Sequence, residues 1–304
     1  MAEEWIRELQ NILDPTQVLQ EEPMAKHTTF KVGGPAQVLV QPQNRQDIAA
    51  VVQICKQANQ PWLVIGAGSN LLVREKGIKG AVIELGANFC KLATAGNVIT
   101  AAAGIRLFDL CRHAARQQLS GLEFAEGIPG SLGGAVFMNA GAYEGEMSQI
   151  VTSVISLDHQ TGQEKSRTPE ELEFSYRHSC FQTNGEIILE ATLMLKPANK
   201  DDIDAKMLEL SQRRREKQPL EFPSAGSTFK RPPGFYVGPL IEEMGLKGHS
   251  IGGAQVSTKH SGFVINRGNA TAQDIMDLIS YIQERVWQEK GIHLEPEVRI
   301  VGEE

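Results

Sequence analysis

The stretch VIGAGSNLLV, residues 64–73, places two glycines directly after a short apolar segment that is typical of a buried strand. Small residues there let backbone N–H groups approach an anion, and Ser69 and Asn70 add polar donors. The loop is not a Walker A sequence, because no Gly-Lys-Ser/Thr follows, and Leu71 stands where a dinucleotide fingerprint needs its third glycine. An anion-binding loop and an ordinary tight turn both remain open.

On either side of this loop, strand and helix patterns alternate, which predicts an α/β or α+β fold. Helices are expected at 2–13, 45–59, 105–119, 201–217 and 271–290, and strands at 36–42, 61–66, 80–86, 98–104 and 295–302. The close spacing of strands between 150 and 196 predicts an antiparallel sheet. The helix at 271–290 has the clearest signals, with Thr271 as its cap, Asp274 three residues later and Gly291 at its end.

The composition is that of an ordinary soluble enzyme, with 41% apolar and 22% charged residues in a chain of 304. This length favours two domains, and the charged stretch near 198–218 indicates a boundary. A net charge of −7 argues against a general nucleic-acid binder. No secretory signal and no apolar run of about 18 residues is present. We therefore expect a cytoplasmic protein without membrane insertion.

The four cysteines are far apart in the sequence and form no C-x-x-C pair. This spacing disfavours a zinc site or a disulfide framework and predicts reduced, mostly buried thiols. Neither the cysteines nor the acidic residues cluster in a way that suggests a metal site. The cysteines are Cys55, Cys90, Cys111 and Cys180.

A second glycine-rich stretch, EGIPGSLGGAVFMNAGAYEGE, occupies residues 126–146. Ser131 is expected to start a helix with Gly133 and Gly134 in its first turn, and a helix start without bulky side chains suits an anion. The alternative is a loop whose glycines serve only packing. Two such loops without an acidic cluster favour a dinucleotide held by backbone amides over a nucleoside triphosphate with Mg²⁺.

The stretch AGSTFKRPPG, residues 225–234, contains the Ser-x-x-Lys spacing of penicillin-directed acyl-enzymes at Ser227 and Lys230. In those enzymes the spacing lies on a helix, whereas Pro232 and Pro233 here disfavour one. Neither a Lys-Thr-Gly nor a Ser-Asp-Asn element occurs elsewhere. We therefore expect Ser227 to display its hydroxyl in a turn beside basic residues, and not to act as a nucleophile.

Two basic features remain ambiguous from the residues alone. Arg177, in FSYRHSCF at 174–181, has the fork geometry for a carboxylate or phosphate, but from the residues alone a surface salt bridge is the favoured interpretation. The run RRREKQ at 213–218 is expected to end a helix, where a solvated face is the simplest interpretation. Within that run, Lys217 is the best candidate to face a ligand.

The ordered set HTTFKVGGPA, IGAGSNLLV, GIPGSLGGAVFMNAGAY, FSYRHSCF, AGSTFKRP, GGAQVSTKHSGFVIN and EPEVRIVG resembles the bacterial UDP-N-acetylenolpyruvoylglucosamine reductase family. The resemblance runs from about residue 20 to the C-terminus and is closest to the shorter class, which lacks an extra substrate-capping loop. Glu144 departs from the family pattern, which has a glycine after AGAY.

The resemblance implies an α+β fold with a vanillyl-alcohol-oxidase-type FAD-binding domain of two subdomains and a C-terminal substrate-binding domain. The expected segments are an N-terminal helix at 1–20, the FAD-binding domain at 21–197, split near 85–90, and the substrate-binding domain at 198–304. The last strand is expected to return to the FAD domain. An oligomer is not implied.

The resemblance also implies non-covalent FAD, NADPH as co-substrate and a UDP-sugar substrate in peptidoglycan precursor synthesis. Hydride passes from NADPH through FAD to the enolpyruvyl group, and Ser227 then supplies the proton. Arg177 and Glu297 stabilise the negative charge, and we expect a raised pKa at Glu297. The cofactor-binding residues are expected to be Gly66, Ala67, Gly68, Ser69, Asn70, Leu71, Gly130, Ser131, Gly133, Gly134, Asn139, Ala140 and Gly141, and the substrate-binding residues Lys217 and Arg231.

Two other classes of protein are weighed against this one. A flavoprotein oxidase of the same superfamily often tethers FAD through a His or Cys near the first glycine loop, and residues 64–73 contain neither. A non-catalytic nucleotide-binding regulator would not need the combination of Arg177, Ser227 and Glu297.

Overall fold

The computed structural model describes residues 4–304, which form two compact units. The first unit consists of the described chain up to Gln20, Val38–Ala67 and Gly80–Arg213. The second unit consists of Glu21–Gln37, Gly68–Lys79 and Arg214–Glu304. Each unit is thus assembled from stretches that are separate in the sequence. The division predicted from the sequence, into segments 1–20, 21–197 and 198–304, stays a prediction about where the domains begin and end.

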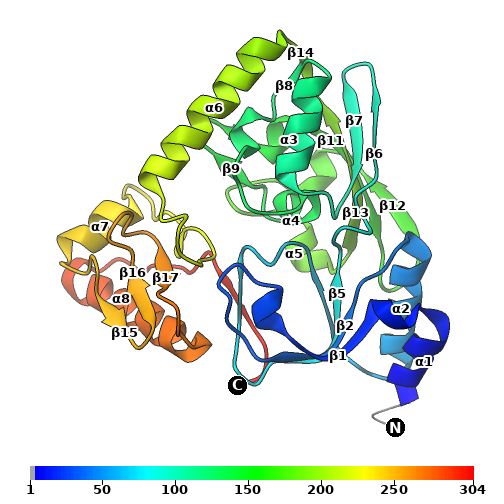
Figure 1. Ribbon diagram of the computed structural model, residues 1–304, viewed down its shortest axis with the longest axis horizontal. Helices are drawn as coiled ribbons and strands as arrows, with labels where there is room; N and C mark the ends of the chain where they lie inside the picture. Colours follow the sequence, from blue (N-terminus) through cyan, green and yellow to red (C-terminus); the bar gives the residue numbers. More distant parts are fainter. Residues whose placement is uncertain (1–3) are drawn as a thin grey trace. The chain divides into compact units, whose positions relative to one another are not determined.

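The first unit contains a five-stranded antiparallel sheet in the order β12-β11-β13-β7-β6 (Figure 1). Its strands are β6 (Leu92–Ala95), β7 (Val98–Ala102), β11 (Val151–Leu157), β12 (Glu164–Arg167) and β13 (Ile187–Met194). The pairing of β11 with β12 and β13 confirms the antiparallel sheet expected between 150 and 196.

A second sheet has the order β1-β2-β5-β3, and β3 runs parallel to β5. Its strands are β1 (Val18–Pro23), β2 (Pro35–Val40), β3 (Trp62–Ile65) and β5 (Ile78–Glu84). Two short antiparallel pairs join β8 (Leu119–Ser120) to β14 (Lys196–Pro197) and β9 (Gly141–Ala142) to β10 (Gly145–Glu146). The first glycine loop begins where β3 ends.

Six α-helices begin in the described part of the first unit, and α1 packs against α2. They are α1 (Glu4–Ile12), α2 (Arg45–Gln57), α3 (Leu107–Arg116), α4 (Leu132–Phe137), α5 (Phe181–Asn184) and α6 (Lys200–Lys217), the last of which continues into the second unit. The helix expected at 2–13 is confirmed from Glu4 to Ile12, while residues 2 and 3 lie outside the described residues.

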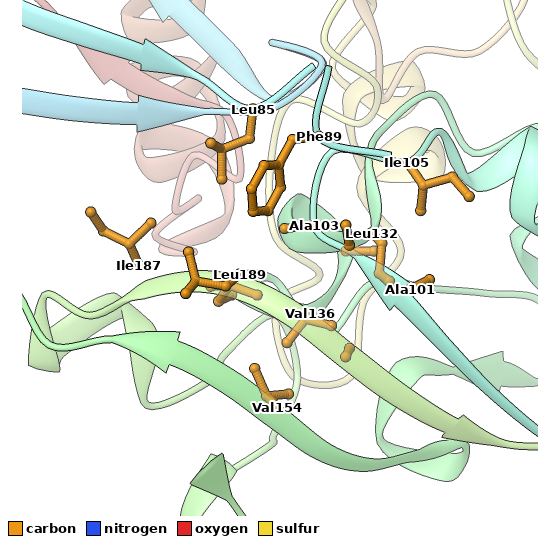
Figure 2. Close-up of a cluster of buried hydrophobic side chains, with 14 of the residues drawn as sticks. Leu85, Phe89, Ala101, Ala103, Ile105, Leu132, Val136, Val154, Ile187 and Leu189 are labelled. Carbon is orange, nitrogen blue, oxygen red and sulfur yellow. The ribbon is translucent and has the colours of Figure 1, made fainter. Parts of the chain in front are cut away.

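The core of the first unit includes a cluster in which the glycine-rich helix α4 meets the sheet (Figure 2). Leu132 and Val136 of α4 are fully buried, as is Leu189 of β13. A Cβ atom on Gly133 would lie 2.8 Å from the Cβ of Ala103, just beyond β7. The absent side chain therefore lets the start of α4 approach the end of β7, which is the packing role that the sequence left open.

The second unit combines two helices with short strands. They are α7 (Val237–Glu243), α8 (Ala272–Lys290), the antiparallel strands β15 (Ser250–Ile251), β16 (Ala254–Val256) and β17 (Val264–Asn266), and the parallel pair β4 (Leu71–Val73) and β18 (Arg299–Val301). The terminal strand is thus shorter than the expected 295–302. Its first part pairs instead through a bridge between Phe229 and Pro296.

The helix α8 matches its sequence signals closely. Thr271 accepts a hydrogen bond from the Asp274 N–H, and the Asp274 carboxylate accepts one from the Thr271 N–H. Gly291 ends the helix with a left-handed φ of 65°. Its predicted apolar stripe is buried and packs on β15, β16 and β17. This stripe consists of Ile275, Leu278, Ile279, Ile282 and Val286.

All four cysteines are free thiols; three are buried, while Cys90 is exposed. Burial raises the pKa of Cys55 to about 11, so this thiol stays protonated at neutral pH. Between residues 4 and 304, no helix combines the length and apolar character needed to cross a membrane.

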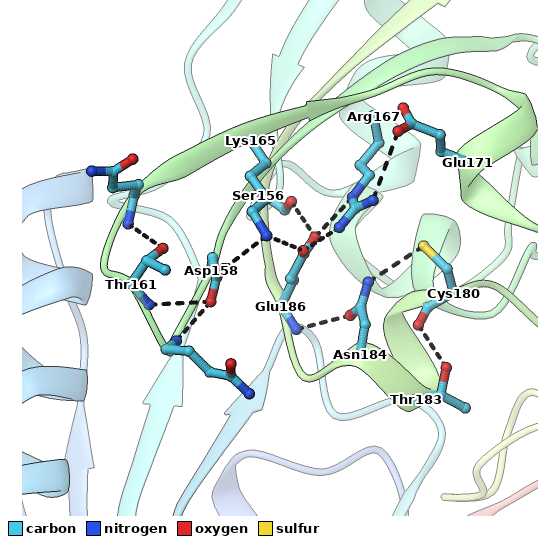
Figure 3. Close-up of polar contacts among 12 residues, drawn as sticks. Ser156, Asp158, Thr161, Lys165, Arg167, Glu171, Cys180, Thr183, Asn184 and Glu186 are labelled. Carbon is cyan, nitrogen blue, oxygen red and sulfur yellow. Dashed lines mark hydrogen bonds and ion pairs between the residues drawn. The ribbon is translucent and has the colours of Figure 1, made fainter.

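A polar network fastens the edge strand β12 to the start of β13 (Figure 3). The Arg167 guanidinium donates to both carboxylate oxygens of the buried Glu186, and Ser156 Oγ donates to the same carboxylate at 2.7 Å. Burial alone raises the pKa of Glu186, but the hydrogen bonds from Arg167 and Ser156 and the nearby positive charges outweigh it. The pKa of Glu186 therefore lies below its usual range.

Because the folded-state pKa is depressed, this stabilisation is complete above the ordinary glutamate pKa of about 4.3 and is lost as the pH falls through the lower folded-state pKa. We expect Glu186→Gln to lower the free energy of unfolding at neutral pH by about 1–3 kcal/mol. The difference from wild type should narrow in acid. Denaturant unfolding across this pH range is the measurement.

Glu171→Gln provides the matched control, since Glu171 is half exposed and lies 3.9 Å from the same Arg167. A surface pair of this kind contributes little to stability. Equal destabilisation by the two substitutions would show that the contribution of Glu186 to stability does not depend on its burial.

Candidate functional site

The first glycine loop links β3 to β4 and has an unusual hydrogen-bonding pattern. None of the backbone N–H groups of residues 66–70 donates to an acceptor within residues 4–304. By contrast, the carbonyl oxygens of Gly68 and Asn70 accept bonds from the N–H groups of Thr29 and Arg299. A row of unpaired amides is the feature that binds anions in loops of this kind.

The two glycine-rich stretches, found separately in the sequence, meet in the first unit. A Cβ atom on Gly66 would lie 2.1 Å from Oγ of Ser131. Ser131 is buried at the start of α4, where its Oγ accepts the N–H of Gly134 at 3.4 Å. Only a residue without a side chain allows this approach at position 66, so the contact explains that glycine.

At the start of α4, some of the backbone N–H groups that the sequence offered for an anion are already hydrogen-bonded within the protein. The N–H of Leu132 donates to Ile105 O at 2.9 Å and that of Gly133 to Ala103 O at 2.8 Å. Because α4 lies so close to the end of β7, these amides are already paired. Within the described part of the chain, the N–H groups of Gly130 and Ser131, which also belong to the expected cofactor contacts, have no acceptor.

The turn after α4 is fixed by the side chain of Asn139, which is 1% exposed. Its Nδ2 donates to Ser175 O at 3.1 Å, and its Oδ1 accepts the Ser148 N–H at 2.9 Å. Both ends of this amide thus hold protein groups. Asn139 therefore shapes the loop that contains Ala140 and Gly141.

Arg177 is brought to this same loop. Its Nη2 donates to Gly141 O at 3.3 Å, and its guanidinium lies 5.1 Å from the centre of the Tyr176 ring. Its backbone has a φ of 56°, a left-handed conformation that is strained for an arginine. Backbone strain of this kind concentrates at functional sites, so Arg177 stays a candidate site residue.

Glu144, the departure from the family pattern, lies at the exposed tip between β9 and β10. The positive φ of this turn falls on Tyr143, at 58°, and Glu144 has no positive φ. A glycine is therefore not required at position 144 for backbone reasons.

In the second unit, Ser227 and Glu297 come from adjacent extended segments. The Glu297 N–H donates to the carbonyl of Thr228 at 2.8 Å, which places Ser227 one residue from this bond. Ser227 is exposed and the segment is not helical. Lys230 pairs with Glu295 at 2.5 Å. These features confirm that the Ser-x-x-Lys spacing does not form the helical arrangement of an acyl-enzyme.

The two basic candidates of the second unit differ in their surroundings. Lys217 is the exposed last residue of α6, and its charge acts with burial, the larger cause, to lower the pKa of His260. Arg231 lies 3.8 Å from the centre of the Tyr236 ring, and its Nε donates to Phe235 O at 3.3 Å. Arg231 is therefore held by its own loop.

The sequence-based reasoning missed Thr228, which is 2% exposed. Its Oγ1 accepts the N–H of Val264 at 2.9 Å, 36 residues away in the chain. No local sequence signal could have identified a hydroxyl whose partner is so distant. Of the residues expected to act in catalysis, Arg177 belongs to the first unit and Ser227 and Glu297 to the second.

Comparisons with known proteins agree with this division of features. Residues 36–165 match the family model of the FAD binding domain, and residues 218–301 match UDP-N-acetylenolpyruvoylglucosamine reductase, C-terminal domain. The expected fold class, an α+β FAD-binding domain followed by a second α+β domain, is confirmed.

Full-length relatives carry the name that the sequence motifs suggested. The UDP-N-acetylenolpyruvoylglucosamine reductase of Syntrophomonas wolfei is 49% identical over 297 residues, covering 98% of this chain and 99% of the relative. That of Caldanaerobacter subterraneus is 48% identical over 303 residues, covering 100% of both. The crystal structure of the enzyme from Thermus caldophilus superposes with a TM-score of 0.79 at 36% identity, covering 93% of this chain and 97% of that one.

With nearly half of all positions identical along its whole length, the chain belongs to the UDP-N-acetylenolpyruvoylglucosamine reductase family.

Proposed function

We propose that this protein reduces the enolpyruvyl group of UDP-N-acetylglucosamine enolpyruvate to give UDP-N-acetylmuramate, a cytoplasmic step of peptidoglycan precursor synthesis. NADPH is the reductant and FAD the non-covalent cofactor. The observation that carries the proposal is the meeting of the two glycine loops at Gly66 and Ser131 in a chain that matches this family along its whole length.

The residues present fit a flavin dinucleotide held by backbone donors. Within the first unit, the unpaired amides of Gly66 and Ala67, with those of Gly130 and Ser131, would hold its pyrophosphate. The loop at 64–73 contains no His or Cys that could form a covalent tether. When bound, FAD supplies a hydride carrier between NADPH and the enolpyruvyl double bond.

Arg177 is proposed to stabilise the negative charge that develops on the enolpyruvyl carboxylate. Preorganised cations are most effective when they need not reorient during the reaction. The bond from Arg177 to Gly141 O and the neighbouring Tyr176 ring restrict the guanidinium in this way. Its strained backbone is a further constraint on its position.

Ser227 is proposed as the proton donor to the substrate carbon, with Glu297 assisting charge stabilisation. The bond between the Glu297 N–H and Thr228 O keeps the two residues on neighbouring segments. The ammonium group of Lys230 pairs with Glu295, which supports a role for Ser227 as a neutral acid and not as a nucleophile activated by that lysine. Lys217 and Arg231 are proposed to bind the uridine diphosphate end.

Gly66→Ala should weaken FAD binding, because its new Cβ would overlap Ser131 Oγ. In the double variant Gly66→Ala with Ser131→Ala, the overlapping oxygen is gone and affinity should partly recover. Flavin fluorescence titration of the apoprotein measures this. Gly86→Ala is the matched control, since its Cβ would meet nothing closer than 3.9 Å. If Gly66→Ala binds FAD with wild-type affinity, the close contact of Gly66 with Ser131 is not part of the FAD site.

Ser227→Ala should separate the two half-reactions. Reduction of the bound flavin by NADPH should keep its wild-type rate, whereas reoxidation by the enolpyruvyl substrate should slow by about 10²–10⁴-fold, as for a lost general acid. Ser227→Cys should recover part of that rate. Stopped-flow absorbance follows both steps, with Ser224→Ala as the nearby serine control. Equal slowing of both half-reactions would remove the proton-donor role.

Lys217→Ala and Arg231→Ala should each raise KM for the sugar nucleotide more than they lower kcat, as expected for uniform binding. Loss of one charge-assisted hydrogen bond, about 1.5–3 kcal/mol, corresponds to roughly tenfold or more in KM. Lys91→Ala, an exposed lysine of the first unit, serves as the control. An unchanged KM in both variants would put the diphosphate elsewhere.

A further inference from the structure

Asn70 differs from its neighbours in the first glycine loop because its side chain already binds protein. Its Nδ2 donates to the carbonyl of Glu297 at 3.0 Å. Its own carbonyl accepts the Arg299 N–H, also at 3.0 Å. Two bonds from one loop residue therefore hold the strand segment around Glu297 from one side, and all three residues belong to the second unit.

Residues 228–230 hold the same segment through backbone hydrogen bonds. The Glu297 N–H donates to Thr228 O and the Lys230 N–H donates to Glu295 O, both at 2.8 Å. Glu297 thus has its N–H bound to Thr228 and its carbonyl bound to Asn70. The segment 295–299 is therefore bonded both to Asn70 and to the residue after Ser227.

Thr228 gives this arrangement a rigid base. Its N–H donates to Gly262 O at 2.9 Å, and its buried hydroxyl accepts the Val264 N–H at 2.9 Å. Movement of Glu297 is therefore opposed by fixed bonds on the Thr228 side. The side-chain amide of Asn70 adds a restraint at the Glu297 carbonyl.

We propose that Asn70 is a positioning residue for the proton-transfer half of the reaction, acting through the backbone of Glu297 and, beyond it, Thr228 and Ser227. This inference rests on the proposed function and reassigns a side chain that the sequence placed among the cofactor contacts. Loss of the Asn70 donor removes this hydrogen bond to the Glu297 carbonyl and lets the segment shift. A displacement of about 1 Å in such a site costs on the order of 10²-fold in rate.

Asn70→Asp is the sharpest test, because it keeps the shape but replaces the donor by an acceptor that faces the Glu297 carbonyl. Reoxidation of the reduced enzyme by the enolpyruvyl substrate should slow by about 10- to 10²-fold. Reduction by NADPH and the affinity for FAD should stay at wild-type values. Asn70→Ser, which can still donate but is shorter, should be intermediate. Asn269→Asp, an exposed asparagine of the same unit, controls for the added charge.

Amide hydrogen exchange of residues 294–299 in the holoenzyme gives a readout that does not depend on turnover. Faster exchange there in Asn70→Asp, with wild-type exchange at residues 275–286 of α8, supports the proposal. If Asn70→Asp does not fold, Asn70→Ser in the same two measurements decides. Unchanged exchange at 294–299 in the folded variants would overturn the proposal.

Two kinetic outcomes would also overturn it. Equal slowing of both half-reactions with weaker FAD binding would make Asn70 a cofactor contact. A lower Tm with both half-reactions unchanged would make its role purely structural. If wild-type enzyme is not reduced by NADPH, the proposed function fails by itself, and the exchange measurement still tests whether Asn70 restrains Glu297.

Discussion

The close approach of the two glycine loops, with Gly66 against Ser131, is the constraint on which the candidate cofactor site depends. Any side chain at position 66 would occupy the space that Ser131 Oγ fills. Ser131 has little room to move away from position 66, since it is buried and caps α4. The helix in turn is fixed by the contact of Gly133 with Ala103. A chain of close contacts thus runs from the end of β3 to the end of β7.

That tight packing also determines which backbone groups remain for a ligand. Where α4 packs against the end of β7, the N–H groups of Leu132 and Gly133 are hydrogen-bonded to the carbonyls of Ile105 and Ala103. At residues 66–70 and at Gly130 and Ser131, the backbone N–H groups stay unpaired within the described residues. The glycines serve close packing in both places, since a Cβ atom would lie 2.8 Å from Ala103 at Gly133, 2.1 Å from Ser131 at Gly66 and 1.9 Å from the His27 carbonyl at Gly68.

The residues proposed for the reaction are supported in two different ways. Arg177 is restrained by its own neighbourhood, through Gly141, Tyr176 and a left-handed backbone. Ser227 and Glu297 are restrained by pairing between segments that are distant in sequence, through Thr228 and Asn70. The second kind of support comes from main-chain bonds. It therefore fixes where the backbone of the two segments lies.

The fold class, the family, the capped helix α8 and the two glycine-rich loops could all be predicted from the order of the residues. These follow from local periodicity, capping residues and ordered motifs, all of which act over a few residues. Three features became visible in the folded chain alone: the contact of Gly66 with Ser131, the pairing of the first amides of α4, and the bond from the Asn70 side chain to the carbonyl of Glu297. They escape prediction because backbone N–H and C=O groups are the same at every position. Which of them stay free depends on partners brought together by folding, and no local pattern records those partners.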